Sequence, residues 1–320
     1  LFRLPQEIPQ EGRITTGCCH VIRRLMFGVA VTALSATAAF AAERPDAAHG
    51  EYLFRATGCA NCHTDRPNKG APLAGGRRLE TKFGIFYAPN ITPDLETGIG
   101  RWTEADFTRA MRHGLDPQGR NYYPSFPYPA YTRLSDEDLK ALWSYLRAQP
   151  PVKQTSREHE LRWFVRNREA VSVWKNMNFR TGMFKPDPLK DAEWNRGAYL
   201  VQAATHCGEC HTPRGVFGGL QHDRELAGSR DGPEGGVVPN ITPDKKTGIG
   251  RWGVSDLVEY LSSGMTPDGD FAGDLMAEMI EHSLKYLTKD DRRAVAIYIL
   301  SRAPVENRLV REKKKKPSGD

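Results

Sequence analysis

Several features are scarce in this 320-residue chain, and each scarcity narrows the class of protein that it can encode. Strand-like runs are almost absent, which argues against an α/β or all-β architecture. No Gly-x-Gly-x-x-Gly unit joins a strand to a helix, so the chain shows no dinucleotide or flavin site of its own. There are only six cysteines. Four fall in two short motifs, and Cys18 and Cys19 lie near the N-terminus.

Long apolar runs are also scarce, and the clearest one lies near the N-terminus. Arg23-Arg24 precedes an apolar segment from Leu25 to Phe40, which is short for a membrane span. The segment ends in the small-x-small pattern Ala39-Phe40-Ala41. This order of charge, apolar run and small residues is typical of a secretory signal peptide. We therefore expect residues 1–41 to be a leader that is removed, and an uncleaved membrane anchor is the alternative.

The other four cysteines occur in one repeated pentapeptide. Cys59-Ala60-Asn61-Cys62-His63 returns as Cys207-Gly208-Glu209-Cys210-His211, each time after a Gly-x-Tyr-Leu segment. Cys-x-x-Cys-His is the attachment signature of c-type haem, because two thiols one helical turn apart can add to the two vinyl groups of the porphyrin. The adjacent histidine then becomes the proximal ligand of the iron. The sequence predicts two covalently bound c-type haems, with His63 and His211 as axial ligands.

Paired cysteines have two other interpretations. Two Cys-x-x-Cys pairs can form a structural zinc site, and one reactive pair can be a redox disulfide. Haem is favoured because histidine follows cysteine directly in both copies and no βαβ pattern accompanies either pair. With residues 1–41 removed, no spare thiol remains, which suits an oxidising compartment. Covalent haem and the signal segment together predict a periplasmic protein.

A longer repeat sets the expected domain organisation. Residues 90–102 return as residues 240–252 with only two positions changed, so the chain contains an internal duplication. Each copy shows a short helix into the motif, a Gly/Pro-rich loop, a further helix and a closing helix. We expect two small, mainly α-helical domains in which haem supplies much of the apolar core. The expected parts are 42–151 and 191–306 for the domains, 152–190 for a partly helical linker and 307–320 for a basic tail.

The helices have recognisable start signals. A helix is expected over 103–113 in the first repeat and over 255–263 in the second. The closing helices begin after Ser135-Asp-Glu-Asp138 and Thr288-Lys-Asp-Asp291, which resemble capping boxes with Asp in place of the preferred Glu. Three aromatic residues of the linker are interpreted as packing residues. They are Trp163, Trp174 and Phe179.

The sixth ligands of the two irons are expected to differ. Met276 lies before the second closing helix, where a distal methionine is a regular feature of class I cytochromes c. Sliding the repeats over each other without gaps places Phe126 opposite Met276, and phenylalanine cannot bind iron. Met111 is the leading candidate at the first haem, with an open iron as the alternative. Further candidates are His113, Met177 and Met183.

The chain resembles the membrane-associated cytochrome c subunits of bacterial periplasmic dehydrogenases for alcohols, gluconate or aldehydes. The resemblance covers nearly all of the chain after residue 41. It rests on segments 88–94, 98–100, 123–128, 134–138, 193–200, 207–213 and 275–278. It implies two tandem class I cytochrome c domains that transport electrons, while another polypeptide oxidises the substrate. A third Cys-x-x-Cys-His domain is missing, and Phe126 replaces a methionine, so both departures point to a two-haem branch.

Two functions follow from these features. The leading hypothesis is a periplasmic dihaem cytochrome that carries electrons from a dehydrogenase subunit to quinone or a terminal oxidase. The second is a dihaem enzyme, peroxidase-like or thiosulfate-oxidising, that uses an open first haem. The net charge of +6 says little about partners, because haem propionates offset it. Lys313–Lys316 favours a solvated tail, with contact to an anionic inner-membrane surface or an acidic partner as the alternative, and no nucleic-acid motif accompanies it.

Overall fold

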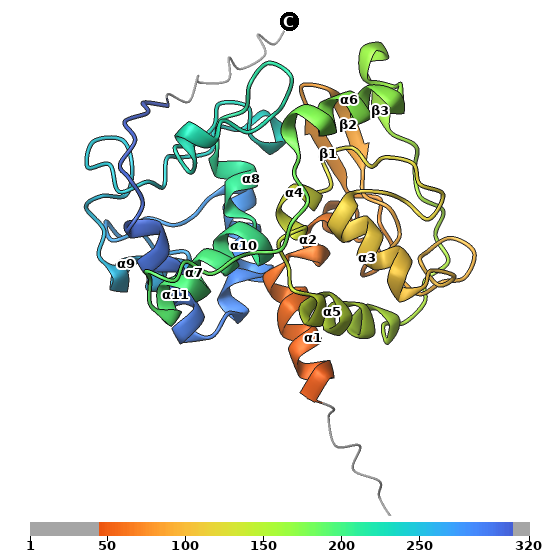
Figure 1. Ribbon diagram of the computed structural model, residues 1–320, viewed down its shortest axis with the longest axis horizontal. Helices are drawn as coiled ribbons and strands as arrows, with labels where there is room; N and C mark the ends of the chain where they lie inside the picture. Colours follow the sequence, from red (N-terminus) through yellow and green to blue (C-terminus); the bar gives the residue numbers. More distant parts are fainter. Residues whose placement is uncertain (1–44, 310–320) are drawn as a thin grey trace, which may run out of the picture. The chain divides into compact units, whose positions relative to one another are not determined.

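The computed structural model describes residues 45–309 (Figure 1). Side chains are described from Ala47 onward. The expected signal segment, the cysteines at 18 and 19 and the lysines at 313–316 lie outside the described residues. Within residues 45–309 the chain is mainly helical, as predicted. No helix in this range combines the length and the apolar character that crossing a membrane requires.

The first repeat begins with two helices at its motif and ends with a closing helix. Its helices are α1 (Pro45–Ala56), α2 (Cys59–His63), η1 (Arg66–Asn68), α3 (Glu104–His113), α4 (Tyr128–Tyr131) and α5 (Asp136–Arg147). Two strands that the sequence analysis did not predict, β1 (Arg78–Thr81) and β2 (Gly84–Tyr87), form an antiparallel hairpin. Each strand has only four residues, so its alternation is too short to stand out in the sequence.

The second repeat has the same order of helices around its motif. They are α7 (Ala192–Tyr199), η3 (Leu200–Ala204), α8 (Cys207–His211), η4 (His222–Arg224), η5 (Pro233–Gly235), α9 (Val254–Ser263), α10 (Asp274–His282), η6 (Leu284–Tyr286) and α11 (Lys289–Leu300). The helices expected over 103–113 and 255–263 are α3 and α9. The second repeat holds one residue more than the first between its Gly-x-Tyr-Leu segment and its motif. The wider turn of the π-helix η3 absorbs that residue.

In each repeat the first helix meets the closing helix at a glycine. A Cβ at Gly50 would lie 2.4 Å from the carbonyl oxygen of Ala141, and one at Gly197 would lie 2.0 Å from that of Ala294. These distances are shorter than van der Waals contact, so a larger residue would push α1 from α5, or α7 from α11. The glycine of each Gly-x-Tyr-Leu segment therefore permits a close helix crossing beside the motif.

The closing helices begin where the sequence predicts, but their capping boxes are not self-contained. Ser135 Oγ accepts the backbone N–H of Asp138 at 3.1 Å, and Thr288 Oγ1 accepts that of Asp291 at 3.0 Å. In the first repeat the N–H of Ser135 donates to the hydroxyl of Tyr199 at 3.1 Å. That hydroxyl in turn donates to the Asp138 carboxylate. A tyrosine of the second repeat thus completes the cap that the sequence pattern suggested for Asp138 alone.

Residues 152–190, the segment expected to be a linker, pack mainly on the first repeat. The elements of this linker segment are β3 (Glu160–Leu161), η2 (Trp163–Val165) and α6 (Arg168–Asn178). Strand β3 pairs antiparallel with β2, and Leu161 and Val171 share a small core with Phe86 and Tyr123. The linker also reaches the second repeat through Phe184, whose ring lies 5.6 Å from that of Tyr199.

The three linker aromatics differ in their surroundings. Phe179 packs edge-on against Tyr128 with ring centroids 5.0 Å apart, so its prediction as a packing residue is confirmed. Trp174 is partly buried and lines the large cavity described below. Trp163 is 81% exposed, so its prediction as a packing residue is wrong. The short turn η2 directs its indole into solvent instead of the core.

Candidate haem sites

Each pair of motif cysteines lies on a single short helix. Cys59 and Cys62 lie one turn apart on α2, and Cys207 and Cys210 lie one turn apart on α8. Burial raises the pKa of the Cys59 thiol to about 11 and that of Cys210 to about 12. The thiols are therefore uncharged at neutral pH. Uncharged thiols on one face of a turn are the groups that would add to the vinyl groups of a porphyrin.

The two motif histidines are held in the tautomer that a metal ligand needs. Nδ1 of His63 lies 2.7 Å from the carbonyl oxygen of Pro89, and Nδ1 of His211 lies 2.8 Å from that of Pro239. A carbonyl can only accept, so Nδ1 carries the proton and Nε2 keeps its lone pair. Burial lowers the pKa of both rings and outweighs the opposing effect of these bonds. Neutral imidazoles oriented in this way would bind iron through Nε2.

The repeated Asn-Ile-Thr-Pro-Asp segment holds these proline carbonyls in place. Asn90 Oδ1 accepts the N–H of Thr92 at 2.9 Å, and its Nδ2 donates to the carbonyl of Val152 at 2.8 Å. In the second repeat Asn240 Nδ2 donates to the carbonyl of Val305 at 2.7 Å. Both asparagines are buried. The segment after each closing helix therefore fixes the turn that orients each motif histidine, which explains the near-identity of the repeats here.

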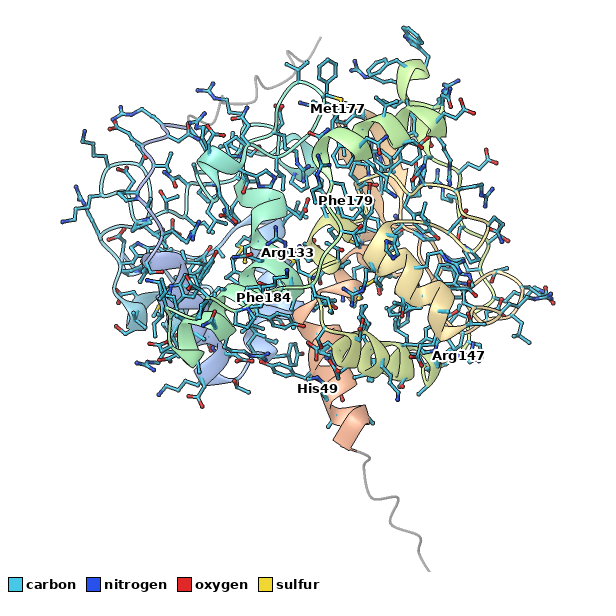
Figure 2. All side chains as sticks on the ribbon, viewed as in Figure 1. His49, Arg133, Arg147, Met177, Phe179 and Phe184 are labelled. Carbon is cyan, nitrogen blue, oxygen red and sulfur yellow. The ribbon has the colours of Figure 1, made fainter. Side chains whose placement is uncertain are left out.

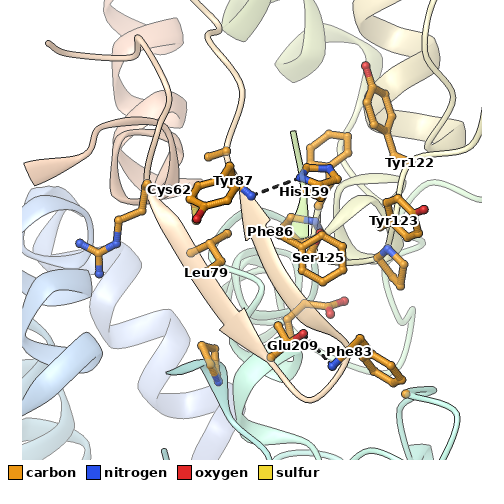
Figure 3. A pocket seen from close by; sticks show the side chains of 18 of the residues that line it. Cys62, Leu79, Phe83, Phe86, Tyr87, Tyr122, Tyr123, Ser125, His159 and Glu209 are labelled. Atoms are coloured by element: carbon orange, nitrogen blue, oxygen red, sulfur yellow. Dashed lines mark hydrogen bonds between the residues drawn. The ribbon is translucent and has the colours of Figure 1, made fainter. Parts of the chain in front are cut away.

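A cavity of about 2160 Å³ adjoins the first motif (Figure 3). Ordinary ligand pockets measure about 300–1,000 Å³, so this cavity has room for a macrocycle. Its lining is largely apolar and aromatic, and it combines residues of the first repeat, the linker segment and the second repeat. Among them are Cys62, His63, Trp102, Phe107, Phe126 and Tyr131.

A buried arginine at this cavity has one nitrogen without a partner. Arg77 is 5% exposed. Its Nη2 donates to Glu234 at 3.1 Å and to Glu278 at 3.4 Å, both in the second repeat. Its Nη1 is buried with no hydrogen-bond partner. An unsatisfied buried guanidinium nitrogen is costly, and a propionate carboxylate of haem is a group that would satisfy it. The residues at the cavity therefore fit the cofactor.

The structure reduces the candidates for a sixth ligand at the first motif. Met111 is 4% exposed and lines the cavity from α3. Met177 lines it from α6 but is 67% exposed (Figure 2). His113 and Met183 are exposed and lie outside the cavity lining, so neither is placed to bind there. Met111 is the buried sulfur among these candidates.

A histidine that the sequence analysis did not single out also lines this cavity. His159 Nδ1 accepts the backbone N–H of Tyr87 at 3.2 Å (Figure 3). Its proton is therefore on Nε2, and burial lowers its pKa and keeps the ring neutral. In this tautomer the ring has no lone pair for a metal. His159 directly precedes β3 within the linker segment and belongs to no motif, so the sequence pattern did not mark it as a site residue.

Phe126 lines the same cavity, as the repeat alignment suggests. Its ring lies 5.5 Å from that of Tyr122 and 5.8 Å from that of Tyr131. This aromatic group forms the wall where the aligned second repeat has Met276. Phenylalanine offers packing but no electron pair for iron.

In the second repeat, helix α10 brings two methionines to different surroundings. Met276 is the third residue of α10 and is partly buried against the core. Met279, which the sequence analysis did not single out, lines the cavity of the first motif. Its sulfur accepts a hydrogen bond from Asn61 Nδ2 at 3.1 Å. The second repeat thus contributes directly to the surroundings of the first motif.

The arrangement of the described side chains can be compared with the alternative interpretation of the cysteine pairs as a structural zinc site. Among residues 45–309 no three or more His, Cys, Asp or Glu side chains converge in a way that would hold a metal ion. The α8 helix nevertheless lies close to the first site, since Glu209 and Cys210 line the same cavity as Cys62. The two motifs are therefore neighbours, and each has its own histidine.

The helical fold and the paired Cys-x-x-Cys-His helices define a c-type cytochrome. The chain belongs to the cytochrome c family: residues 47–150 match the family Cytochrome c. It is 42% identical over 269 residues to a dihaem cytochrome c from Cereibacter sphaeroides. The matched region covers 83% of this chain and 88% of that protein.

Subunits of dehydrogenases are also similar to this chain. It is 41% identical over 264 residues to the fructose dehydrogenase cytochrome subunit of Gluconobacter japonicus, with 81% of this chain and 53% of that subunit covered. It is 38% identical over 280 residues to the gluconate 2-dehydrogenase cytochrome c subunit of Pantoea cypripedii, with 83% and 63% covered. The chain thus spans about half to two thirds of these two subunits. The expected resemblance to dehydrogenase cytochromes is confirmed.

Proposed function

We propose that this chain is a periplasmic dihaem cytochrome that takes electrons from a dehydrogenase subunit and passes them to quinone or a terminal oxidase. The observation that carries the proposal is the pair of neutral histidines, each with Nδ1–H on a proline carbonyl beside two thiols. Haem in such a site supplies an iron that gains and loses one electron at a time. The names of the similar subunits, which belong to dehydrogenases, support the partner.

Each repeat would hold one haem in its own domain, residues 42–151 and 191–306, with 152–190 as linker. Cys59 and Cys62 would form the thioether bonds in the first domain, and Cys207 and Cys210 would form them in the second. The proximal ligands would be His63 and His211. The sixth ligands would be Met276 in the second domain and Met111 in the first.

The described residues suit electron transfer more than substrate oxidation. The thiols are the attachment groups, and the large cavity is lined by apolar and aromatic side chains around the motif. In this proposal the partner dehydrogenase oxidises the substrate, and the two haem sites of this chain would relay the electrons. A periplasmic site and removal of residues 1–41 remain part of the proposal, as does peripheral contact of the basic tail with the inner membrane.

Intact-mass spectrometry and a haem assay test this proposal directly. We expect the protein exported to the periplasm to begin near Ala42 and to carry two covalent haems. A Cys59→Ala/Cys62→Ala variant should keep one. If a neighbouring gene encodes a dehydrogenase, that enzyme should reduce the wild-type protein. A full-length protein without covalent haem, or one that such a dehydrogenase fails to reduce, would contradict the proposal.

One observation favours a second function, a dihaem enzyme of the peroxidase-like or thiosulfate-oxidising type. Phe126 forms the cavity wall where a methionine would otherwise stand. If Met111 does not bind the first iron, that iron has an open position. Rapid cyanide binding by the oxidised protein would support the enzyme. Two low-spin sites that ignore cyanide would support the electron carrier.

A further inference from the structure

The residue before each motif has a left-handed backbone in both repeats. Gly58 precedes α2 with φ of 64°, and His206 precedes α8 with φ of 40°. Glycine adopts this conformation without cost. Histidine at the same place is strained, because its Cβ crowds the backbone in this conformation. Glycine would serve in the second repeat as well as in the first, so the imidazole of His206 calls for its own explanation.

The side chain of His206 reaches across to the first repeat. Its Nε2 lies 3.2 Å from the carbonyl oxygen of Thr57, the residue before Gly58. A carbonyl can only accept, so Nε2–H donates. The hydroxyl of Tyr131 donates to the same oxygen at 2.9 Å. The rings of His206 and Tyr131 meet edge to face, with centroids 5.4 Å apart.

These contacts link the two attachment sites through a short run of bonds. Cys207 follows His206 directly, and Cys59 follows Thr57 after one glycine. The hydroxyls of Thr57 and Thr205 also lie 3.2 Å from the sulfurs of Cys59 and Cys207. One hydrogen bond, from His206 to Thr57, therefore connects the first thioether residue of one repeat to that of the other.

We propose that His206 is a positioning residue for electron exchange between the two haem sites. Its hydrogen bond to Thr57 holds α8 against the start of α2 and completes the route from Cys207 to Cys59. One electron passes, so one site is oxidised by one electron and the other is reduced by one. His206 keeps its proton and its oxidation state. This inference rests on the proposed dihaem function.

Three substitutions separate the imidazole from the backbone strain. His206→Gly restores the residue of the first repeat, which relieves strain and removes the donor. His206→Asn also tolerates the left-handed backbone but is too short to reach Thr57. His206→Gln places an amide nitrogen near the position of Nε2. His222→Gly, at an exposed histidine of the same repeat, is the matched control.

The measurement is the rate of electron exchange between the sites after flash photoreduction of the full-length holoprotein by a soluble flavin. We expect a rate several-fold slower in the Gly and Asn variants, recovery in the Gln variant and no change in the control. Reduction potentials should stay near those of the wild type, which separates slower coupling from a changed driving force. A wild-type rate in the Gly or Asn variant, or a Gln variant as slow as these, would overturn the inference.

The haem assay on the same samples separates the two proposals. If the wild-type protein holds fewer than two haems, the proposed function fails, and the role of His206 fails with it. If every variant holds two haems and exchanges electrons at the wild-type rate, only the role of His206 fails. Thermal unfolding of the Gly variant at or above the wild-type midpoint would show that a slower rate does not come from a weakened fold.

Discussion

Tyr199 of the second repeat donates its phenolic hydrogen to Asp138 of the first repeat. Tyr52 of the first repeat makes the matching bond to Asp291 of the second. Both tyrosines come from the Gly-x-Tyr-Leu segments, and both hydroxyls also accept the backbone N–H of a cap residue. Each repeat thus completes the cap of the other's closing helix. This reciprocal exchange joins the first helix of each repeat to the closing helix of the other.

Removing either hydroxyl should weaken the whole protein. Tyr199→Phe and Tyr52→Phe each leave a buried aspartate with one donor fewer, and each should lower the free energy of unfolding by about 1–2 kcal/mol. Urea unfolding of the holoprotein measures this change. Tyr286→Phe, at a half-exposed tyrosine, should change it little. Equal stability of all three variants would contradict the role of the exchange.

The Asp291 carboxylate should make stability depend on acid pH. Burial raises its pKa, but hydrogen bonds from Arg196 and Tyr52 outweigh that effect, so the net pKa lies below its ordinary value of 3.8. The folded state therefore favours the charged form. This contribution is present in full above pH 3.8 and is lost as the pH falls through the lower pKa of the folded state.

Asp291→Asn should remove that part of the acid sensitivity. The asparagine variant should be less stable than the wild type near neutral pH, and the difference should narrow as the pH falls below about 4. Urea unfolding at a series of pH values measures the difference. Asp290→Asn, at the exposed neighbouring residue, is the control. A difference that is constant across this range would show that the charge of Asp291 does not matter.

Arg77 should raise the reduction potential of the first haem. A cation beside the site stabilises the reduced state, which carries one positive charge fewer than the oxidised state. Arg77→Ala should therefore lower that potential, and the second should shift less. Arg78→Ala, at an exposed arginine paired with Glu80, should leave both unchanged. A redox titration with both potentials intact in Arg77→Ala would argue against a propionate at Nη1.

Much of the fold was predictable because its signals are local. The caps at Ser135 and Thr288 and the helices after the repeated segments follow from residues a few positions apart. The tyrosines that complete those caps were not predictable, because Tyr199 and Ser135 are distant in sequence. The hairpin of β1 and β2 was missed for a different reason. Its strands are short, and β3, the strand that pairs with β2, lies far along the chain in the linker segment.

The candidate sites show the same division. The motif cysteines and histidines, together with Phe126, could be singled out from spacing and from the alignment of the repeats. Arg77, Met279 and His206 could not, because each makes hydrogen bonds with the opposite repeat, far away in sequence. For His206 the sequence offers one signal, the contrast with Gly58 at the equivalent position of the first repeat. The contrast becomes informative only when the backbone is known to be left-handed at both positions.

The methionines provide the test that decides between the two functions. Met276→Ala should lower the potential of the second haem and leave the first nearly unchanged, because loss of a thioether ligand favours the oxidised iron. Met111→Ala should lower the potential of the first haem and allow cyanide to bind its iron. Met265→Ala, at a partly exposed methionine, is the control.

Redox titration and absorption spectra of the oxidised protein measure both effects. If Met111→Ala changes neither the first potential nor the spin state while the wild type already binds cyanide, the first iron is open in the native protein. The electron-carrier proposal would then give way to the enzyme. If the wild type ignores cyanide and Met111→Ala binds it, the buried sulfur of Met111 is the ligand that replaces the methionine missing at Phe126.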